Sequence, residues 1–576
     1  MERFAATAER IASHPAKLEK IAILAEYLAS LDDADLLAAA RFFSGTPFAA
    51  RDRRTLSVGG RTLVEVAQRV WGFDDAALGR GYRATGDLGA ALGPLLRAPQ
   101  EAMLFSERLT PATLDAMFGE IAEAAGKRAG RRREAVLERI LRACTNPLVA
   151  TYVVKIVTGD LRVGLREGLV LDAIARAFSA ESAAVRRGAM AAGDVGEVAL
   201  AAKHGTLAAL RVDYGAPIGF MLATPLPYGD AYKELAGAQW VFEDKYDGIR
   251  AQAHVRAGVV HLFSRRLNEV TKSYPEVAAA LAKIVGDAIL DGEIVAIRDG
   301  RVLPFRSLQA RLQRKTIDEA LQREVPIAYV AFDLLAIGDE LLLDEPLSQR
   351  RERLADLFAS SAHLIHAPFE NTGELAAADV NARFEAARAR GNEGLMLKRT
   401  DSPYAPGRRG KWWLKLKREL STLDVVVVAV EWGSGKRAKV LSDYTFAVRG
   451  DDGDLLTIGK AYSGLTDVEI AELTPWFLDH RLPDERRREK ARAWEIPVEP
   501  EIVLEIAFDV IQKSDLHESG FSLRFPRIVR VRDDKPAEDV DTIERVREIY
   551  GEMLAREEGW PTHVTTMSAT PSIRRS

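Results

Sequence analysis

Hydrophobic residues recur at every third or fourth position through the first part of the chain, where alanine and leucine dominate. This spacing is typical of amphipathic helices that bury one face. One helix start is explicit, because Thr110 is a good N-cap and Pro111 is favoured at the first helical position. The pattern predicts an all-α domain over residues 1–215.

The pattern changes in the segment YGAPIGFMLATPLPYG at 214–229, where glycine and proline cluster as they do in linkers. Short runs of β-forming residues follow, including AILDGEIVAI at 288–297 and PIAYVAFDLLAI at 326–337. Helical stretches such as LSQRRERLADLF at 347–358 interrupt these runs. We therefore expect a mixed α/β domain over residues 216–419.

A second change follows, after which most segments have the character of strands and hairpins. Examples are VVVVAVEWG at 425–433 and EIVLEIAFDVI at 501–511. Short strands separated by turn residues predict a small β-barrel, here over residues 420–556. The last residues, 557–576, have the composition of a disordered tail, and the chain contains no internal repeat.

Composition narrows the class of protein. A chain of 576 residues is longer than one hydrophobic core usually serves, and a net charge of −4 with 28% charged residues is typical of a soluble globular protein. Any nucleic-acid surface must therefore be local. No apolar run approaches the roughly 20 residues of a membrane helix, and the N-terminus lacks a signal-peptide core, so we expect a cytoplasmic protein, associated with the nucleoid in a bacterium.

Cysteine and histidine usage excludes two kinds of site. The single cysteine, Cys144, cannot form a disulfide framework or a zinc site of the clustered-cysteine kind, and the nine histidines show no metal-binding pair spacing. A phosphate-binding P-loop is also missing, because the nearest segment, GSGKRAK at 433–439, fails the pattern. A nucleotide would have to be bound in another way.

One lysine stands out within VFEDKYDGIRAQAHV at 241–255, a segment that alternates like a half-buried strand. Lys245 could be an ordinary strand-edge cation or a nucleophile. Further charged residues interrupt later apolar runs in a fixed order: Arg265, Asp291, Glu293, Asp333, Glu393, Lys398, Arg409, Lys415 and Lys417. The aromatic Phe332, directly before Asp333, belongs to the same set. Each alone is more often a solvated strand end or a packing residue. As a set, they predict a site, since buried charges need partners and could share a polyphosphate and its metal.

The segments that carry these residues, KYDGIR, SRRLNEVT, LDGEIVAI, YVAFDLL, EGLMLK and WLKLK, resemble the motif series of the ATP-dependent DNA ligases. These enzymes are covalent nucleotidyltransferases. GFSLRFPRIVRVRDDK at 520–535 is similar to their C-terminal motif, and residues 146–178 more weakly resemble the helical domain of the larger ligases. The resemblance implies an all-α DNA-binding domain, an α/β nucleotidyltransferase (adenylation) domain and a C-terminal OB-fold β-barrel.

The resemblance also implies a nucleophile. Lys245 would attack the α-phosphate of ATP and carry AMP as a phosphoramidate, and Asp247, two residues on along the same strand face, would orient the amine. The amine must be neutral to attack. We expect partial burial, neighbouring cations such as Arg250 and Lys415, and bound magnesium to favour the neutral form.

By the same resemblance, Glu243 would recognise the adenine and Phe332 would stack on it. Arg250 and Arg265 would hold the ribose or a phosphate. These roles place residues from several strands around one nucleotide.

Metal and phosphate contacts complete the implied site. Glu293 would hydrogen-bond the ribose or help bind the metal, and Glu393 would be the main ligand of Mg²⁺, or of Mn²⁺ in its place. Three basic residues would neutralise the phosphates, namely Arg409, Lys415 and Lys417.

The implied partner is nicked double-stranded DNA, sealed by a monomer in replication, repair or recombination. In the helical domain we expect contacts from Arg131 and Arg132, within a basic run at 127–142, and from Arg162. The run by itself is better explained as an exposed helix face with charge pairs. In the barrel, Arg530, Arg532, Asp534 and Lys535 would form a mobile motif that closes over ATP and then swings away.

Three alternatives differ in substrate or in activity. NAD-dependent DNA ligases carry a four-cysteine zinc element, which one cysteine cannot build. RNA ligases and mRNA capping enzymes share the core, but capping enzymes lack the helical N-terminal arm. The third alternative is a non-catalytic DNA-binding scaffold whose nucleotide site has decayed. The presence of Lys245, Glu393 and Lys415 argues against it, because a decayed site would be free to lose them, but one sequence leaves this alternative open.

Overall fold

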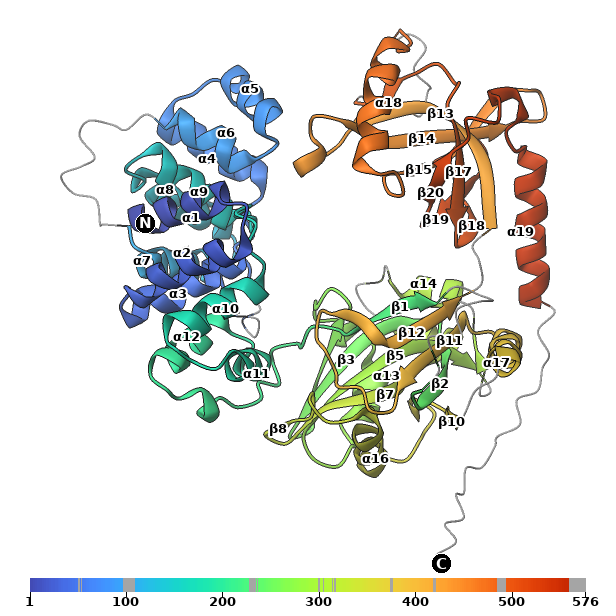
Figure 1. Cartoon of the computed structure of the whole chain (residues 1–576), viewed down its shortest axis with the longest axis horizontal. Helices are drawn as coiled ribbons and strands as arrows, with labels where there is room; N and C mark the ends of the chain where they lie inside the picture. Colours follow the sequence, from blue (N-terminus) through green and yellow to red (C-terminus); the bar gives the residue numbers. More distant parts are fainter. Residues whose placement is uncertain are drawn as a thin grey trace, which may run out of the picture. The chain divides into compact units, whose positions relative to one another are not determined.

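The computed structural model describes the chain apart from residues 50, 51, 53, 97–108, 227–234, 236, 299–300, 304, 313, 315–316, 373–376, 418–420, 484–493 and 559–576. Most of the expected C-terminal tail lies outside the described residues. Two compact units make up the chain. Their helices and strands are labelled in Figure 1. The first contains residues 1–224, 235–374 and 396–415, and the second contains 225–234, 375–395 and 416–576.

The first unit begins with a region built from helices, as predicted. They are α1 (Glu2–Ser13), α2 (Lys17–Ala29), α3 (Asp33–Ser44), α4 (Gly60–Trp71), α5 (Asp75–Thr85), α6 (Leu88–Leu92), α7 (Pro111–Glu123), α8 (Ala129–Arg142), α9 (Pro147–Val157), α10 (Glu167–Ala177), α11 (Ser182–Ala192) and α12 (Val195–Lys203). The expected start at Thr110 is confirmed, because its hydroxyl accepts the Thr113 N–H and Thr113 returns a bond to the Thr110 N–H. This reciprocal cap fixes the first turn of α7.

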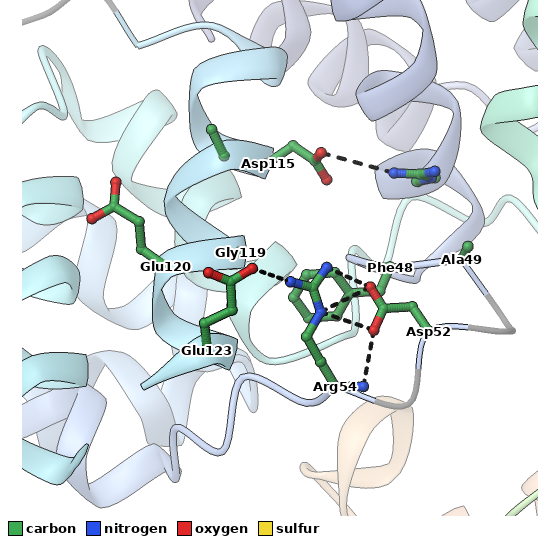
Figure 2. A pocket seen from close by; sticks show the side chains of 10 residues that line it. Phe48, Ala49, Asp52, Arg54, Asp115, Gly119, Glu120 and Glu123 are labelled. Carbon is green, nitrogen blue, oxygen red and sulfur yellow. Dashed lines mark hydrogen bonds and ion pairs between the residues drawn. The ribbon is translucent and has the colours of Figure 1, made fainter. Parts of the chain in front are cut away.

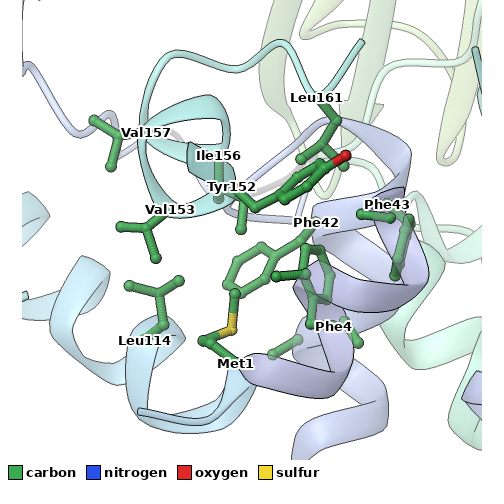
Figure 3. Close-up of a cluster of buried hydrophobic side chains, with 14 of the residues drawn as sticks. Met1, Phe4, Phe42, Phe43, Leu114, Tyr152, Val153, Ile156, Val157 and Leu161 are labelled. Atoms are coloured by element: carbon green, nitrogen blue, oxygen red, sulfur yellow. The ribbon is translucent and has the colours of Figure 1, made fainter. Parts of the chain in front are cut away.

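Aromatic side chains form the centre of the helical core. The rings of Phe4 and Phe43 lie 4.4 Å apart, and Phe42 packs edge-on against Phe4 at 6.2 Å (Figure 3). Tyr152 of α9 lies beside them and donates its hydroxyl to Glu9 at 2.8 Å. Burial of such rings accounts for much of the stability of a helix bundle.

The rest of the first unit holds two sheets. One has the strand order β4-β3-β5-β7-β8, with β6 beside β5 and β9 beside β7, and the other has the order β1-β12-β11-β2-β10. Their bounds are β1 (Leu222–Leu226), β2 (Trp240–Lys245), β3 (Ile249–Arg256), β4 (Val259–Ser264), β5 (Ala288–Arg298), β6 (Arg301–Val302), β7 (Ile327–Ile337), β8 (Glu340–Leu341), β9 (Leu364–His366), β10 (Phe369–Thr372), β11 (Gly394–Arg399) and β12 (Arg409–Lys417). The helices here are α13 (Pro275–Leu281), α14 (Phe305–Leu312), α15 (Glu319–Glu324) and α16 (Leu347–Leu357). The predicted α/β character is confirmed.

The segment 241–255 departs from the expectation of one half-buried strand. It forms most of β2, a turn and most of β3, and every residue from Ala251 to Val255 is buried. The polar side chains within it are internal: Gln252 bonds both the N–H and the carbonyl of Ile218, and His254 bonds Gln252 at 2.7 Å. Alternation failed as a guide because hydrogen-bonded polar residues can face a packed linker as well as solvent.

Burial of His254 predicts a pH-dependent stability. Desolvation lowers the pKa of this imidazole from 6.5 to about 3, although a hydrogen bond to the Tyr214 carbonyl partly opposes the shift. Between these values the unfolded chain takes up a proton that the folded chain refuses, so stability falls as the pH drops below about 6.5. At pH 5 the loss is at most about 2 kcal/mol, because the Tyr214 carbonyl and the Gln252 amide oxygen are both acceptors and so favour a proton on each ring nitrogen. Hydrogen exchange of β3 amides in urea at pH 7.5 and pH 5 measures it.

A histidine on the paired strand provides the control for this prediction. His261 lies opposite His254 in the register of β3 and β4 but is only half-buried. The His254→Gln variant should lose the extra acid sensitivity, whereas His261→Gln should keep it. An equal pH dependence in wild type and His254→Gln would contradict the assignment.

The second unit is rich in strands. Its sheet has the order β15-β14-β13-β17-β20, with β16 on β13, and β18 pairs with β19. The elements are α17 (Ala377–Ala389), β13 (Ser421–Trp432), β14 (Leu441–Arg449), β15 (Leu455–Ala461), α18 (Asp467–Asp479), β16 (Ile496–Pro497), β17 (Val503–Phe508), β18 (Val510–Lys513), β19 (Phe521–Arg524), β20 (Arg527–Val531) and α19 (Ile543–Glu558). The Ile528 N–H donates to the Ser463 carbonyl at 2.9 Å, so the two ends of the sheet meet, as in the expected barrel. Helices α18 and α19 were not predicted.

Candidate active site

Lys245 lies where the chain passes from one sheet to the other. It ends β2 of the five-stranded sheet, and after a turn Ile249 begins β3 of the larger sheet. Asp247 lies in that turn, so its expected place on the same strand face as Lys245 is wrong. Gly248 is required for the crossing, because a Cβ there would lie 2.4 Å from the Ile294 carbonyl oxygen. The lysine is half-buried and directly precedes a tightly packed turn.

Aromatic and basic side chains from both sheets meet around Phe332. The Lys398 ammonium of β11 lies 4.0 Å from the ring centroid of Phe332 on β7 and 4.4 Å from that of Trp413 on β12. The two rings pack edge to face at 6.2 Å. The Trp413 side chain is 1% exposed, and its indole N–H has no hydrogen-bond partner among the described residues. A buried donor of this kind is suited to a ligand acceptor or an ordered water.

Glu243 of β2 is joined to the same group. It is 4% exposed, and its two carboxylate oxygens contact Arg351 Nη1 and, at 2.6 Å, Lys398 Nζ. Burial lowers the pKa of the Lys398 ammonium, while the charge of Glu243 acts in the opposite direction. The expected adenine reader thus lies beside the expected stacking ring, because Lys398 contacts both.

A second buried cluster surrounds Arg250 at the start of β3. Its guanidinium donates to both Asp291 oxygens, at 3.1 and 2.6 Å, and to the Met221 carbonyl at 2.7 Å. The Tyr404 hydroxyl donates to Asp291 at 2.7 Å. Burial alone would lower the pKa of Arg250, but the charge of Asp291 raises it above its ordinary value. Arg250 is therefore a fixed, permanently charged donor.

The other predicted nucleotide residues occupy different surroundings. Glu293 lies opposite Arg250 in the register of β5 and β3, and Lys415 is half-buried on β12. Arg265 is exposed in the turn after β4, so the expectation that it interrupts a strand is wrong. Arg409 is exposed at the first position of β12, and the side chain of Lys417 lies outside the described residues.

The expected metal ligands can be judged by their donor chemistry. Glu293 is half-buried, and Glu393 precedes β11 within the second unit. Within the described part of the chain, no three His, Cys, Asp or Glu side chains gather in a metal-binding group. Carboxylates of this kind fit Mg²⁺, which is commonly held by one or two of them together with phosphates and water.

Two adjacent arginines of α16 were missed by the sequence reasoning. Arg350 donates to both oxygens of Asp333 on β7, at 2.8 and 2.9 Å, while Arg351 reaches Glu243 on β2. One helix thereby links the two sheets that supply the site. The signal was present, because Leu347, the two arginines and Leu354 recur with helical spacing and share the buried face.

The expected DNA-contacting arginines have unlike surroundings. Arg131 and Arg132 are exposed on α8, whose neighbours Arg139 and Arg142 form ion pairs with glutamates at 2.8 and 2.6 Å. Arg162 adopts a positive φ of 52° and donates to Asp160 at 2.7 Å. The helix face therefore combines charge pairs with exposed cations.

The basic residues of the predicted C-terminal motif, Arg530, Arg532 and Lys535, are paired with carboxylates of the second unit. Arg532 and Lys535 both contact Asp424, at 2.7 and 2.9 Å, and Arg532 also donates to Asp534 at 2.9 Å. Arg530 pairs separately with Glu505 on β17 at 2.8 Å. The two cations on Asp424 would have to leave that carboxylate to bind a phosphate.

A cavity of about 430 Å³ lies in the helical region, and its lining is acidic, unlike that of a phosphate-binding site (Figure 2). Four acidic residues line it, and Arg54 pairs with Asp52 at 2.6 Å and with Glu123 at 2.7 Å. Burial raises the pKa of Asp115, another lining residue. An acidic lining repels phosphates, so this cavity does not suit a nucleotide or DNA.

Family comparisons match most of the chain. The models described as "DNA ligase N terminus", "ATP dependent DNA ligase domain" and "ATP dependent DNA ligase C terminal region" match residues 1–175, 220–417 and 437–535. Among the described residues, none of the helices combines the length and apolar character that a membrane crossing requires.

Whole-length relatives agree with these models. The chain is 47% identical to a probable DNA ligase of Koribacter versatilis (strain Ellin345) over 574 residues, covering 96% of each. It is 37% identical to a DNA ligase of Methanothrix thermoacetophila, covering 95% of this chain and 98% of that relative. A solved structure titled Pmar-Lig_PreS3 has a TM-score of 0.56 at 18% identity, over 92% of this chain and 99% of that one, and shows the fold alone. Residues 1–535 thus carry the family's three parts in order, and the chain belongs to the ATP-dependent DNA ligases.

Proposed function

We propose that this chain seals nicks in double-stranded DNA in three steps through a lysyl-AMP intermediate on Lys245. Nick sealing is the general function of the family to which it belongs. The single observation that carries the residue assignment is the position of Lys245 at the crossing between two sheets, two residues after Glu243 on β2, whose carboxylate contacts Lys398.

In the first step the Lys245 amine attacks the α-phosphorus of ATP. A P–N bond forms, the bond to the pyrophosphate oxygen breaks, and the nitrogen loses one proton. The nearby turn at Gly248 supports this role, because close packing holds the nucleophile in place. Asp247 in the same turn orients the amine.

The nucleotide is held by groups from both sheets. Glu243 reads the adenine, Phe332 stacks on it, and Arg250 and Arg265 bind the ribose or a phosphate. Fixed donors such as Arg250 lower the barrier without reorganising during the reaction.

Metal and phosphate contacts come from acidic and basic residues respectively. Glu393, assisted by Glu293, would hold Mg²⁺ or Mn²⁺, which when bound would neutralise charge on the phosphates. The basic residues assigned to the phosphates are Arg409, Lys415 and Lys417.

AMP then passes to the 5′-phosphate of the nick, and the 3′-hydroxyl displaces it. Residues 1–215 bind the duplex, in part through Arg131, Arg132 and Arg162. We assign residues 216–419 to adenylation and 420–556 to the OB-fold. The protein acts as a monomer in the cytoplasm, in replication, repair or recombination.

Incubation of the purified chain with α-labelled ATP and magnesium, followed by a nicked duplex, tests the proposal. We expect a labelled covalent adduct that disappears as the nick is sealed. Parallel reactions with α-labelled GTP and labelled NAD test the related enzyme classes. If ATP gives no adduct, the assignment is wrong and a non-catalytic DNA-binding role gains support.

A variant of the C-terminal motif separates the steps. Lys535→Met removes a cation that must leave Asp424 to reach the phosphates, so self-adenylation should slow about 10- to 100-fold. Joining of a nick that already carries AMP should be spared. Gel assays of both reactions measure this, with Lys513→Met, an exposed lysine on β18, as the control. An equal loss in both reactions would contradict a role limited to the first step.

A further inference from the structure

Residues 214–221, which the sequence pattern predicts to be a linker, form a buried strap against β3. The exposed fractions are 5%, 4%, 6% and 0% for Tyr214, Ile218, Phe220 and Met221. Three of these side chains pack in the hydrophobic cluster that also contains Phe332. A backbone buried this deeply needs hydrogen-bond partners from its surroundings.

One face of β3 supplies partners for the strap. Arg250, Gln252 and His254 alternate along the strand, so their side chains lie on the same side of the sheet. Gln252 accepts the Ile218 N–H at 2.7 Å and donates to the Ile218 carbonyl at 3.0 Å. The two ring nitrogens of His254 lie 2.9 Å from the Tyr214 carbonyl oxygen and 2.7 Å from the Gln252 amide oxygen. Gln252 and His254 therefore fix the first half of the strap.

Arg250, the third residue of this face, is held by the second half of the strap. Its guanidinium donates to the Met221 carbonyl at 2.7 Å, and its central carbon lies 4.8 Å from the ring centroid of Phe220. The Met221 N–H donates to the Tyr404 hydroxyl at 3.1 Å. That hydroxyl donates to Asp291, the carboxylate that pairs with Arg250. Both backbone groups of Met221 are thus joined to the Arg250 cluster.

The two halves of the strap cannot move independently. Only two residues separate Ile218 from Met221, and each Cα lies about 3.8 Å from the next. The Phe220 carbonyl accepts the Gly407 N–H at 3.1 Å, which holds the C-terminal half through backbone. At Ile218 the bonds come from the Gln252 side chain. Without that amide, the Ile218 N–H and carbonyl are buried and unpaired, and the strap has to shift to pair them again.

We propose that Gln252 is a positioning residue for adenylation, which acts through the strap to fix the Arg250 guanidinium. The inference rests on the proposed adenylation of Lys245 and adds to it a residue outside the assigned nucleotide contacts. Gln252 is 0% exposed and bonds the strap, so its influence on the nucleotide passes through the strap and Arg250. Misplacing a binding group by about 1 Å can lower a rate about 100-fold.

Single-turnover self-adenylation of the full chain with α-labelled ATP tests this role. Gln252→Met keeps the length of the side chain and removes both hydrogen bonds to Ile218. The second-order rate constant for adduct formation should fall about 10- to 100-fold. The final amount of adduct counts the folded protein, so it separates slow chemistry from a loss of folding. Gln349→Met, which changes an exposed glutamine of α16, is the matched control and should react at the wild-type rate.

A second background shows whether Gln252 acts through Arg250. Arg250→Lys keeps a cation, so adduct formation stays measurable, but it removes the planar fork that the strap positions. Adding Gln252→Met to Arg250→Lys should therefore lower the rate constant less than about 2-fold. A merely structural role of Gln252 would lower the amount of adduct and leave the rate constant of the folded protein unchanged.

A change in the strap itself provides an independent comparison. Phe220→Leu removes the ring beside the guanidinium and should lower the rate constant about 10-fold in the wild-type background. In the Arg250→Lys background it should lower it less than about 2-fold. Equal fold losses in both backgrounds, or a wild-type rate constant for Gln252→Met, overturn the inference and leave the proposed function intact. A wild-type chain that forms no adduct with ATP fails on the proposed function.

Discussion

Replacement of Lys245 by alanine is expected to abolish the covalent adduct with α-labelled ATP, a loss of at least about 10⁴-fold. The amine nitrogen is the atom that bonds to phosphorus, and an alanine side chain has no nucleophilic group. Lys245→Arg should fail as well, because a guanidinium stays protonated and cannot act as the nucleophile. Denaturing gels of the labelled protein measure the adduct directly.

The controls for this prediction separate chemistry from folding. Lys272→Ala changes an exposed lysine of the same unit and should leave the adduct unchanged. The Lys245→Ala protein should still join a nick that already carries AMP, since that step bypasses the lost nucleophile. A labelled adduct on Lys245→Ala would place the nucleophile at another residue.

The order of the domains could be predicted from the sequence because hydrophobic residues recur with a different spacing in each part of the chain. Helical spacing predicted the region from α1 to α12, and short β-type runs predicted the two sheets that follow. Helices α18 and α19 of the second unit were missed. The cap at Thr466 and Glu469 was a legible start for α18, but Pro475 lies inside that helix and breaks the usual pattern.

Burial of polar residues was harder to predict than their presence. The sequence placed Asp291, Asp333 and Lys398 among buried strands, and these side chains are 0%, 0% and 1% exposed. Their partners come from distant segments, so no local pattern names them. Arg350 and Tyr404 are examples, since each completes a carboxylate that lies on another element.

Arginine in a predicted helix is usually assigned to the exposed face. For this reason the buried ion pairs made by α16 were not predicted. Charged residues follow one another there, and only the positions of Leu347, Leu354 and Leu357 reveal which face is buried. Arg350 and Arg351 fall on that face. A buried arginine needs a carboxylate, and the sequence cannot say which of several carboxylates in the later strands supplies it.

The second large effect is expected from Arg350→Leu, which should destabilise the first unit by about 3–5 kcal/mol. The side chains of Arg350 and Asp333 are both 0% exposed, and the substitution leaves the Asp333 carboxylate buried without its cation. Thermal unfolding should show a fall of roughly 10 °C in the transition of this unit. Arg353→Leu on the same helix should cost no more than about 1 kcal/mol, because the Arg353 pair with Glu340 is largely solvated.

A double variant distinguishes a buried charge pair from simple packing. Asp333→Leu combined with Arg350→Leu removes both charges, so part of the loss should be recovered, giving a coupling of at least about 2 kcal/mol. Recovery stays incomplete because the Glu345 carbonyl and the Ser402 carbonyl, which accept from Arg350, each lose one donor. Additive losses would contradict the pairing.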